Sequence, residues 1–251
     1  MIKKGIWVVV IFLIFIIVTI SIYFYVEEEG YYIIALGDSL AHGTTPYRKQ
    51  DASFADFVAA HYQEKGLLTF FTKEFTKPGH RSNDLMKDIK LNRYIKVDSN
   101  KLYLKTAIYN ADIIMISIGA NDLFRKLGIK SVADVPNLAN IERLIDDIIV
   151  DLDELFLEIA NLSSGHVFVI GYYDPIARFN LKLSESELNP IIYANKELAR
   201  LANAHGMHFI DIYDLFRSNP EFLPNRFNIH PSLEGYQAIA DKIINHKSLL
   251  N

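Results

Sequence analysis

The sequence predicts an α/β protein, an open sandwich in which helices cover a parallel sheet. Three observations support this fold class. From residue 31 onward, short apolar runs rich in β-branched and aromatic residues alternate with longer amphipathic segments. The apolar runs are continuous, which is typical of strands buried on both faces of a sheet. Helical segments separate these runs, as expected where right-handed crossovers connect parallel strands.

Five segments are predicted strands. The four clearest are short, apolar and bounded by Gly, Asp or Asn, and they are 31–37, 113–119, 167–173 and 207–213. Such residues commonly flank strands because they favour turns. A fifth segment, 67–75, has a more mixed composition, so we place it at an edge of the sheet.

The segments between the strands show helical periodicity. From 138 to 159, apolar residues recur every three or four positions, with acidic residues on the other face. A coiled coil has similar spacing, but beside a sheet we expect this apolar face to pack on the sheet. Further helices are predicted at 193–206 and 233–247. Because no second domain boundary is visible, residues 30–251 are predicted to form one domain.

The N-terminus contains an uncharged apolar stretch from Gly5 to Val26, preceded by lysines and followed by glutamates. As a helix, this stretch would span roughly 30 Å, the thickness of a bilayer core. The lysines before it predict that the N-terminus is cytoplasmic and the rest of the chain is outside. A cleaved signal peptide is the alternative, although its apolar region is usually only about 7–15 residues long. We therefore expect residues 1–29 to be a membrane anchor.

Composition argues against several functions. The formal net charge is −4, so the chain has no cationic surplus for neutralising nucleic-acid phosphates. Cysteine is absent, which excludes disulfides, thiolate metal sites and a cysteine nucleophile. His205 and His208 have no third metal-ligating residue nearby in the sequence. We therefore expect neither a metal nor another cofactor, and no nucleic-acid partner.

Chemically useful residues follow the predicted strands. Ser39 comes directly after the first strand, within the tetrapeptide GDSL, and Gly79 follows the second. Asn121 follows the strand at 113–119, and His230 precedes the last helix. The carboxyl ends of parallel strands lie along one rim of a sheet, where open α/β proteins bind ligands. Together these residues would supply a nucleophile, oxyanion donors and a general base, as acyl transfer requires.

Helix capping is the alternative role for Ser39, since Ser and Asp are common at strand-to-helix turns. The other three blocks favour catalysis, with Asp38 supporting the turn and Asp122 capping the next helix. The nucleophile elbow of α/β-hydrolases, G-x-S-x-G, does not match. Ala41 replaces its second glycine, and the serine follows the first strand rather than a later one.

These blocks, in this order, resemble those of the SGNH/GDSL hydrolases over residues 31–241. The resemblance rests on Ser39 in GDSL, Gly79 in KPGHRSNDL, Asn121 in GAND and His230 in IHPSLEGY. It implies a flavodoxin-like, three-layer fold of about five parallel strands and hydrolysis of esters or thioesters without a metal. In this mechanism Ser39 attacks, His230 is the base, and the oxyanion is bound by the Ser39 and Gly79 N–H groups and the Asn121 side chain.

One position departs from the family pattern. The family usually has an aspartate three residues before the histidine, and Phe227 occupies that position here. Asn228 and Asn225 are nearby, and an asparagine can accept a hydrogen bond from the imidazole while adding no negative charge. Asn228, a backbone carbonyl or a distant carboxylate therefore remain as candidates for orienting His230.

The sequence thus predicts a membrane-anchored serine esterase that works outside the cytoplasm through an acyl-serine intermediate. Lipid esters and acyl groups on cell-envelope glycans are the expected substrates. Two alternatives remain: an O-acyltransferase that delivers the acyl group to a sugar, and a catalytically silent ligand-binding module. Within 172–190, the side chains of Phe179, Leu181 and Leu183 either line an acyl groove or pack against the domain.

Overall fold

The computed structural model describes residues 30–129, 140–175 and 185–249. The predicted anchor, residues 1–29, lies outside these ranges, and so do Phe179, Leu181 and Leu183. Every helix in the described ranges is too short or too polar to cross a bilayer.

The core of the fold is a five-stranded parallel sheet with the order β2-β1-β5-β6-β7. The five strands are β1 (Tyr31–Gly37), β2 (Leu68–Thr76), β5 (Ile113–Ser117), β6 (His166–Ile170) and β7 (His208–Ile210). This confirms the predicted α/β class and the edge position of β2. Three strands end earlier than predicted, at Ser117, Ile170 and Ile210, and the residues that follow them lie outside the sheet.

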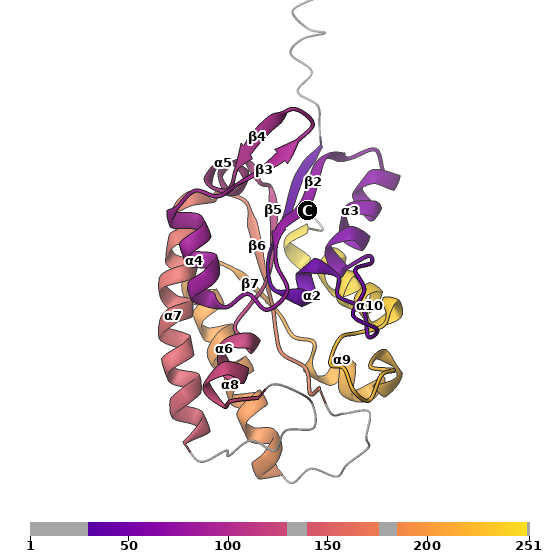
Figure 1. The fold of residues 1–251 in the computed structure, drawn as a ribbon. Coiled ribbons are helices and arrows are strands. Elements are labelled where there is room, and N and C mark those ends of the chain that lie inside the picture. Colours follow the sequence, from indigo (N-terminus) through magenta and orange to yellow (C-terminus); the bar gives the residue numbers. More distant parts are fainter. Residues whose placement is uncertain (1–29, 130–139, 176–184, 250–251) are drawn as a thin grey trace, which may run out of the picture. The chain divides into compact units, whose positions relative to one another are not determined.

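Two layers of helices cover the sheet (Figure 1). On one face lie α4 (Ser82–Lys90), α5 (Leu104–Asn110), α7 (Ile141–Leu162) and α8 (Glu185–Ala204). On the other lie α3 (Phe54–Glu64) and α10 (Leu233–Ile244), and α9 (Tyr213–Ser218) adds Phe216 to the core there. The remaining elements are α2 (Ser39–His42), α6 (Ala120–Lys126), the hairpin β3 (Tyr94–Val97) and β4 (Asn100–Tyr103), and the 3-10 turns Pro220–Phe222 and Lys247–Leu249.

Strand β1 shows why both layers are needed. Ile34 and Leu36 pack into the core beneath α4, α5, α7 and α8, whereas Ile33 and Ala35 pack beneath α3 and α10. Successive side chains of a strand point to opposite faces, so a continuous apolar run requires cover on both sides. The apolar face of α7 packs into the first of these cores, as predicted.

Local sequence signals misjudge one helix and miss one hairpin. Helix α8 begins at Glu185 and continues through Pro190, whereas the prediction began at residue 193. The antiparallel hairpin of β3 and β4 was not predicted, because its strands are short and mostly exposed.

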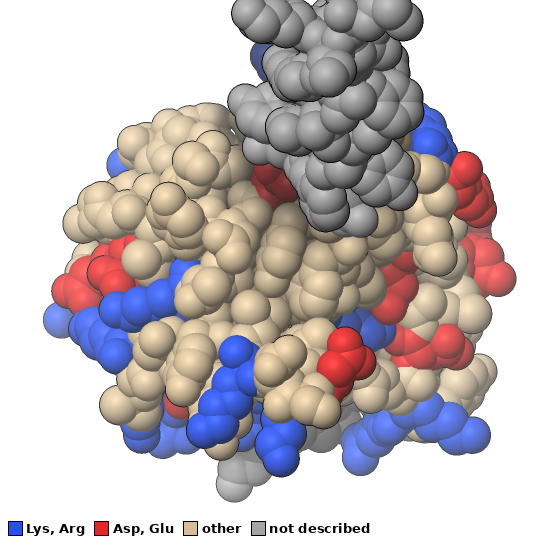
Figure 2. Space-filling model, turned by 90° about the horizontal axis from the view of Figure 1, so that it is seen from above, with Lys and Arg blue, Asp and Glu red and all other residues tan. Residues whose placement is uncertain are grey.

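Charged side chains of both signs are spread around the edge of the face shown in Figure 2.

Candidate active site

Ser39 is the first residue of α2, which begins directly after β1. The cap of this helix is Asp38, whose carboxylate accepts hydrogen bonds from the Leu40 N–H at 3.0 Å and the Ser117 hydroxyl at 2.9 Å. The prediction that Asp38 supports the turn is therefore confirmed. Because Asp38 supplies the cap, the hydroxyl of Ser39 is not needed for capping.

Gly37 allows the sharp exit from β1. Its φ is +115°, and a Cβ at this position would lie 1.9 Å from the carbonyl oxygen of Ser117. Any side chain would therefore push β1 away from β5 and displace the turn that carries Ser39.

His230 contacts Ser39 across 191 positions of the sequence, with its Nε2 atom 2.8 Å from Oγ. The preceding residue is held by Tyr173, whose hydroxyl donates to the carbonyl of Ile229 at 2.6 Å. Helix α10 begins just after, capped by the side chain of Ser232. The imidazole is thus fixed from both sides within proton-transfer distance of the serine.

Asn228 contacts the other nitrogen of the ring. Its Oδ1 atom lies 2.6 Å from Nδ1 of His230 and also accepts the backbone N–H of His230 at 2.9 Å. A backbone N–H can only donate, so the contacting atom is the carbonyl oxygen and Nδ1 carries the hydrogen. Nε2 is then the acceptor that faces the hydroxyl of Ser39, which is the tautomer a general base needs.

Asn225 and Phe227, which are also near His230 in the sequence, have other surroundings in the structure. Asn225 donates to the carbonyl of Pro46 at 2.7 Å and accepts the N–H of Phe227 at 2.9 Å. Phe227, at the position of the family's aspartate, is 71% exposed. Of the sequence candidates, the structure brings Asn228 against the imidazole.

The electrostatics keep His230 neutral. Burial, together with the nearby cation of Arg48, lowers the pKa of His230 to about 4. Asn228 brings no negative charge that would oppose these effects. A neutral imidazole at pH 7 is the form that can accept a proton from Ser39.

Asn121 lies in the first turn of α6, beside the loop that carries Gly79. Its Nδ2 atom donates to the carbonyl of His80 at 3.0 Å, which uses one of its two N–H bonds. Ser39 contributes a second donor, since the first N–H of a helix has no helical acceptor. Gly79 has a φ of +80° and is exposed, and it does not line the cavity described below.

The prediction for Asp122 is wrong. The sequence predicts that Asp122 caps the helix that follows the strand, but Asp122 lies within α6 and its carboxylate accepts the N–H of Ser82 at 3.0 Å and the Ser82 hydroxyl at 2.6 Å. The cap position of α6 is taken by Gly119, with a φ of +103°. Asp122 therefore ties α6 to the start of α4 and holds the loop of Gly79 beside Asn121.

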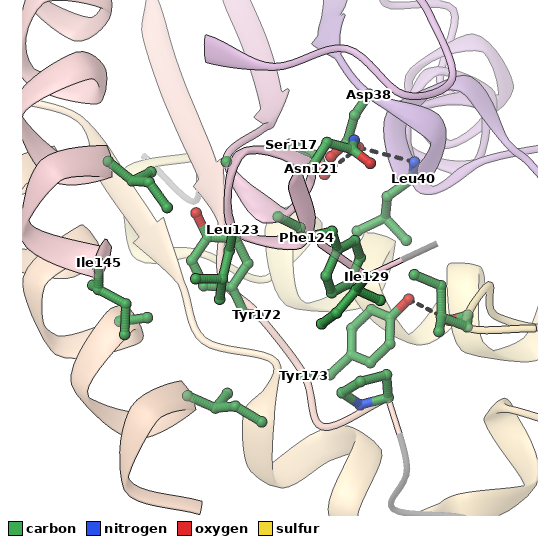
Figure 3. Close-up of a pocket in the computed structure, with 18 of the residues that line it drawn as sticks. Asp38, Leu40, Ser117, Asn121, Leu123, Phe124, Ile129, Ile145, Tyr172 and Tyr173 are labelled. Atoms are coloured by element: carbon green, nitrogen blue, oxygen red, sulfur yellow. Dashed lines mark hydrogen bonds between the residues drawn. The ribbon is translucent and has the colours of Figure 1, made fainter. Parts of the chain in front are cut away.

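A cavity of about 250 Å³ opens beside these groups. Ser39, Asn121 and His230 line it, and apolar side chains of α6, α7 and α8 form most of the remaining wall. Figure 3 shows Asp38 and Asn121 on one side, Ile145 on the other, and Leu123 and Tyr172 between them.

Sequence reasoning missed the residues that shape this cavity. Asn195 of α8 accepts the Tyr172 N–H at 2.7 Å and donates to the Tyr172 carbonyl at 2.8 Å, which fixes the loop after β6. The signal in the sequence was an asparagine on the same helical face as Leu198 and Ala202, and in the structure Asn195 is buried. Within the described residues, no group of three or more His, Cys, Asp or Glu side chains is arranged to hold a metal ion.

Residues 35–238 match the model of the GDSL-like lipase/acylhydrolase family. No curated protein shows significant sequence similarity to the chain.

Several solved structures share the fold. A lipase from a goat rumen metagenome is 21% identical to this chain with a TM-score of 0.62. The alignment covers 84% of this chain and 94% of the lipase. An extracellular lipase from Streptomyces rimosus is 22% identical with a TM-score of 0.59, and the shares covered are 83% and 97%. An acetylxylan esterase from Geobacillus stearothermophilus is 15% identical with a TM-score of 0.59, and the shares are 86% and 94%.

Proposed function

Because this chain belongs to the GDSL-like lipase/acylhydrolase family and is a hydrolase, we propose that it cleaves carboxylic esters through an acyl-serine intermediate on Ser39. The observation that carries the proposal is the chain of contacts from Asn228 through His230 to Ser39, at 2.6 and 2.8 Å. This arrangement provides a nucleophile, a base in the required tautomer and a group that orients the base.

In the first step, Nε2 of His230 accepts the proton of Ser39 while Oγ attacks the ester carbonyl. The negative charge that develops on the carbonyl oxygen is stabilised by the Ser39 N–H and the Asn121 side chain. Gly79 is proposed as a third donor, because its loop is tied to Asn121 through the carbonyl of His80. His230 then protonates the departing alcohol, and the acyl group stays on Ser39.

In the second step, His230 removes a proton from water, which attacks the acyl-serine. The bond between the acyl carbon and Oγ then breaks, His230 gives the proton to Oγ of Ser39, and the acid is released. The acceptor in this proposal is water. If a sugar hydroxyl attacked instead, the same intermediate would make the protein an O-acyltransferase. Adding an acylated donor together with a glycan and measuring acid against acylated glycan separates the two reactions.

The proposal is tested with the full-length chain. A fluorophosphonate probe should label it and a chromogenic ester should be cleaved, whereas Ser39→Ala should lose both signals and keep its melting temperature. Ser218→Ala, at an exposed serine, is the matched control and should behave like the unchanged protein. If Ser39→Ala retained labelling or hydrolysis, the mechanism would be wrong. If the unchanged protein were neither labelled nor active, a silent binding module would be the better description.

We also propose that residues 1–29 anchor the protein in a membrane, with the hydrolase domain outside the cytoplasm. The apolar stretch from Gly5 to Val26, with lysines before it, supports this orientation. Such a location would bring lipid esters and acylated envelope glycans within reach. The full-length chain should resist alkaline extraction from membranes, and protease added to intact spheroplasts should digest the domain. Release of the whole protein by alkali, or protection from the protease, would contradict the proposal.

A further inference from the structure

The cavity beside Ser39 separates polar from apolar side chains. Asp38, Ser39, Ser117, Asn121 and His230 lie at its catalytic end. The described residues that form the rest of the wall are almost all apolar, and they include Leu123, Phe124, Ile141, Ile145, Ile149 and Ala194. A ligand that extends from the serine therefore enters an increasingly apolar space.

Two tyrosines in the wall do not change this character. The hydroxyl of Tyr172 donates to the carbonyl of Ile118 at 3.0 Å, and that of Tyr173 donates to the carbonyl of Ile229 at 2.6 Å. Both phenol groups thus use their single hydrogen on the protein itself. A sugar in the apolar part of this space would lose hydration and find few hydrogen-bonding side chains among the described residues, whereas a hydrocarbon chain needs none.

The size of the cavity sets the length of the ligand. An apolar cavity of about 150 Å³ holds benzene, which gives roughly 25 Å³ for each carbon. A cavity of about 250 Å³ therefore has room for about ten carbons. Native cores contain few voids larger than a water molecule, so an unfilled space of this size at the active site indicates a binding pocket.

We propose that this cavity is an acyl pocket that selects acyl groups of about ten carbons. The proposal rests on the esterase function proposed above and adds the substrate class to it. The carbonyl lies at Ser39 and Asn121, and the chain extends between α6 and α8 toward α7. Ile145 lies on the opposite side of the cavity from Asn121 (Figure 3), so it contacts the distal part of the chain.

This arrangement predicts a specific dependence on chain length. Each buried methylene strengthens binding by about fourfold, so kcat/KM should rise from acetyl to decanoyl esters. The rise should stop near decanoyl, because a longer chain would have to leave the cavity or displace its wall. An acetyl esterase would show the opposite order.

Variants of the wall locate the effect. Ile145→Trp fills the distal part of the cavity and should lower kcat/KM for octanoyl and decanoyl esters by at least about tenfold, while acetyl and butyryl esters change by less than about twofold. Ala194→Leu, on α8, is a second and smaller obstruction with the same expected pattern. Val150→Trp is the matched control, because Val150 lies on the same helix as Ile145 but is 62% exposed. It should leave the chain-length profile unchanged.

The assays use the full-length chain in nanodiscs, since detergent alkyl chains would compete for the pocket. p-Nitrophenyl esters from acetyl to palmitoyl give the kinetic profile. In parallel, calorimetry measures decanoate binding to Ser39→Ala and to the double variant Ser39→Ala, Ile145→Trp. Decanoate partitions into the nanodisc lipid to the same extent in both samples. The difference in decanoate binding between the two variants therefore reports binding in the pocket alone.

The outcomes separate this inference from the proposed function. A profile that peaks at acetyl, or that Ile145→Trp and Ala194→Leu lower equally at all lengths, would overturn the acyl pocket while leaving the esterase intact. Decanoate binding that Ile145→Trp abolishes, without hydrolysis of any ester, would support the pocket and reject the esterase. Equal decanoate binding to both Ser39→Ala proteins would reject the pocket even if esters are cleaved.

Discussion

Asn228→Asp tests how strongly His230 depends on the group that contacts its Nδ1 atom. In the structure this group is the uncharged Oδ1 of Asn228, at 2.6 Å. Aspartate has nearly the same shape, so it would keep an oxygen at this position and add a full negative charge. The imidazolium that forms when Ser39 is deprotonated would then be stabilised. We expect faster hydrolysis by Asn228→Asp than by the unchanged protein.

The magnitude follows from the short contact and the burial of the site. Opposite charges about 4 Å apart attract by ~4 kcal/mol at an effective dielectric constant of about 20. Burial of the new carboxylate offsets part of this, because Asn228 is only 7% exposed. A net gain of about 1.5–3 kcal/mol, typical of hydrogen bonds to charged groups, corresponds to a roughly 10- to 150-fold increase in kcat/KM.

The same interaction should shift the pH profile. Activity requires a neutral imidazole, so it falls as the pH drops below the pKa of His230, which is about 4 in the unchanged protein. The new carboxylate stabilises the cation and should raise this pKa by roughly one to two units. The acidic limb of the kcat/KM profile for a p-nitrophenyl ester should therefore move to higher pH by that amount.

Asn225→Asp is the matched control for added charge. Its side chain contacts Pro46 and Phe227 rather than the imidazole, so it should leave both rate and acidic limb nearly unchanged. If Asn228→Asp left the rate and the limb where they are, or if both variants shifted them equally, Asn228 would not be the group that orients His230.

Asn121→Ala should lower kcat by about 10²–10³-fold, since one oxyanion donor is lost; an unchanged kcat would remove Asn121 from the mechanism. Asp122→Ala should lower the free energy of unfolding by about 1–3 kcal/mol in urea, because the buried N–H and hydroxyl of Ser82 lose their acceptor. Burial raises the pKa of Asp38 to about 7, so the unchanged protein should lose stability as the pH rises from about 4 to 7. Asp38→Asn keeps an acceptor oxygen and does not titrate. If the Tm of this variant still declined over the same pH range, Asp38 would not be the cause of the decline.

Much of the fold was predictable because its signals are local. The continuous apolar runs at β1 and β5 and the stripe on α7 reflect burial on both faces of a sheet, which the sequence expresses directly. Helix α8 shows the limit of such signals. A proline at residue 190 indicates a boundary, yet the helix starts at Glu185 and continues through it.

The candidate site was only partly predictable. The turns that carry Ser39, Asn121 and His230 could be recognised because each follows a predicted strand or precedes a predicted helix. For the partner of the imidazole, the sequence left Asn228, a backbone carbonyl and a distant carboxylate as candidates. Asn228 lies on an irregular segment, and nothing in the spacing shows whether its side chain turns toward the ring.

The sequence by itself determined the α/β class and placed the nucleophile and the base at the same rim, because strand ends and turn residues are encoded by neighbours along the chain. Only the tertiary structure decided that Asn228 contacts His230, that Asp122 binds Ser82 of another helix, and that α6, α7 and α8 enclose an apolar cavity. These features join segments that are far apart in sequence or depend on the direction of single side chains, so their geometry arises only when the layers pack.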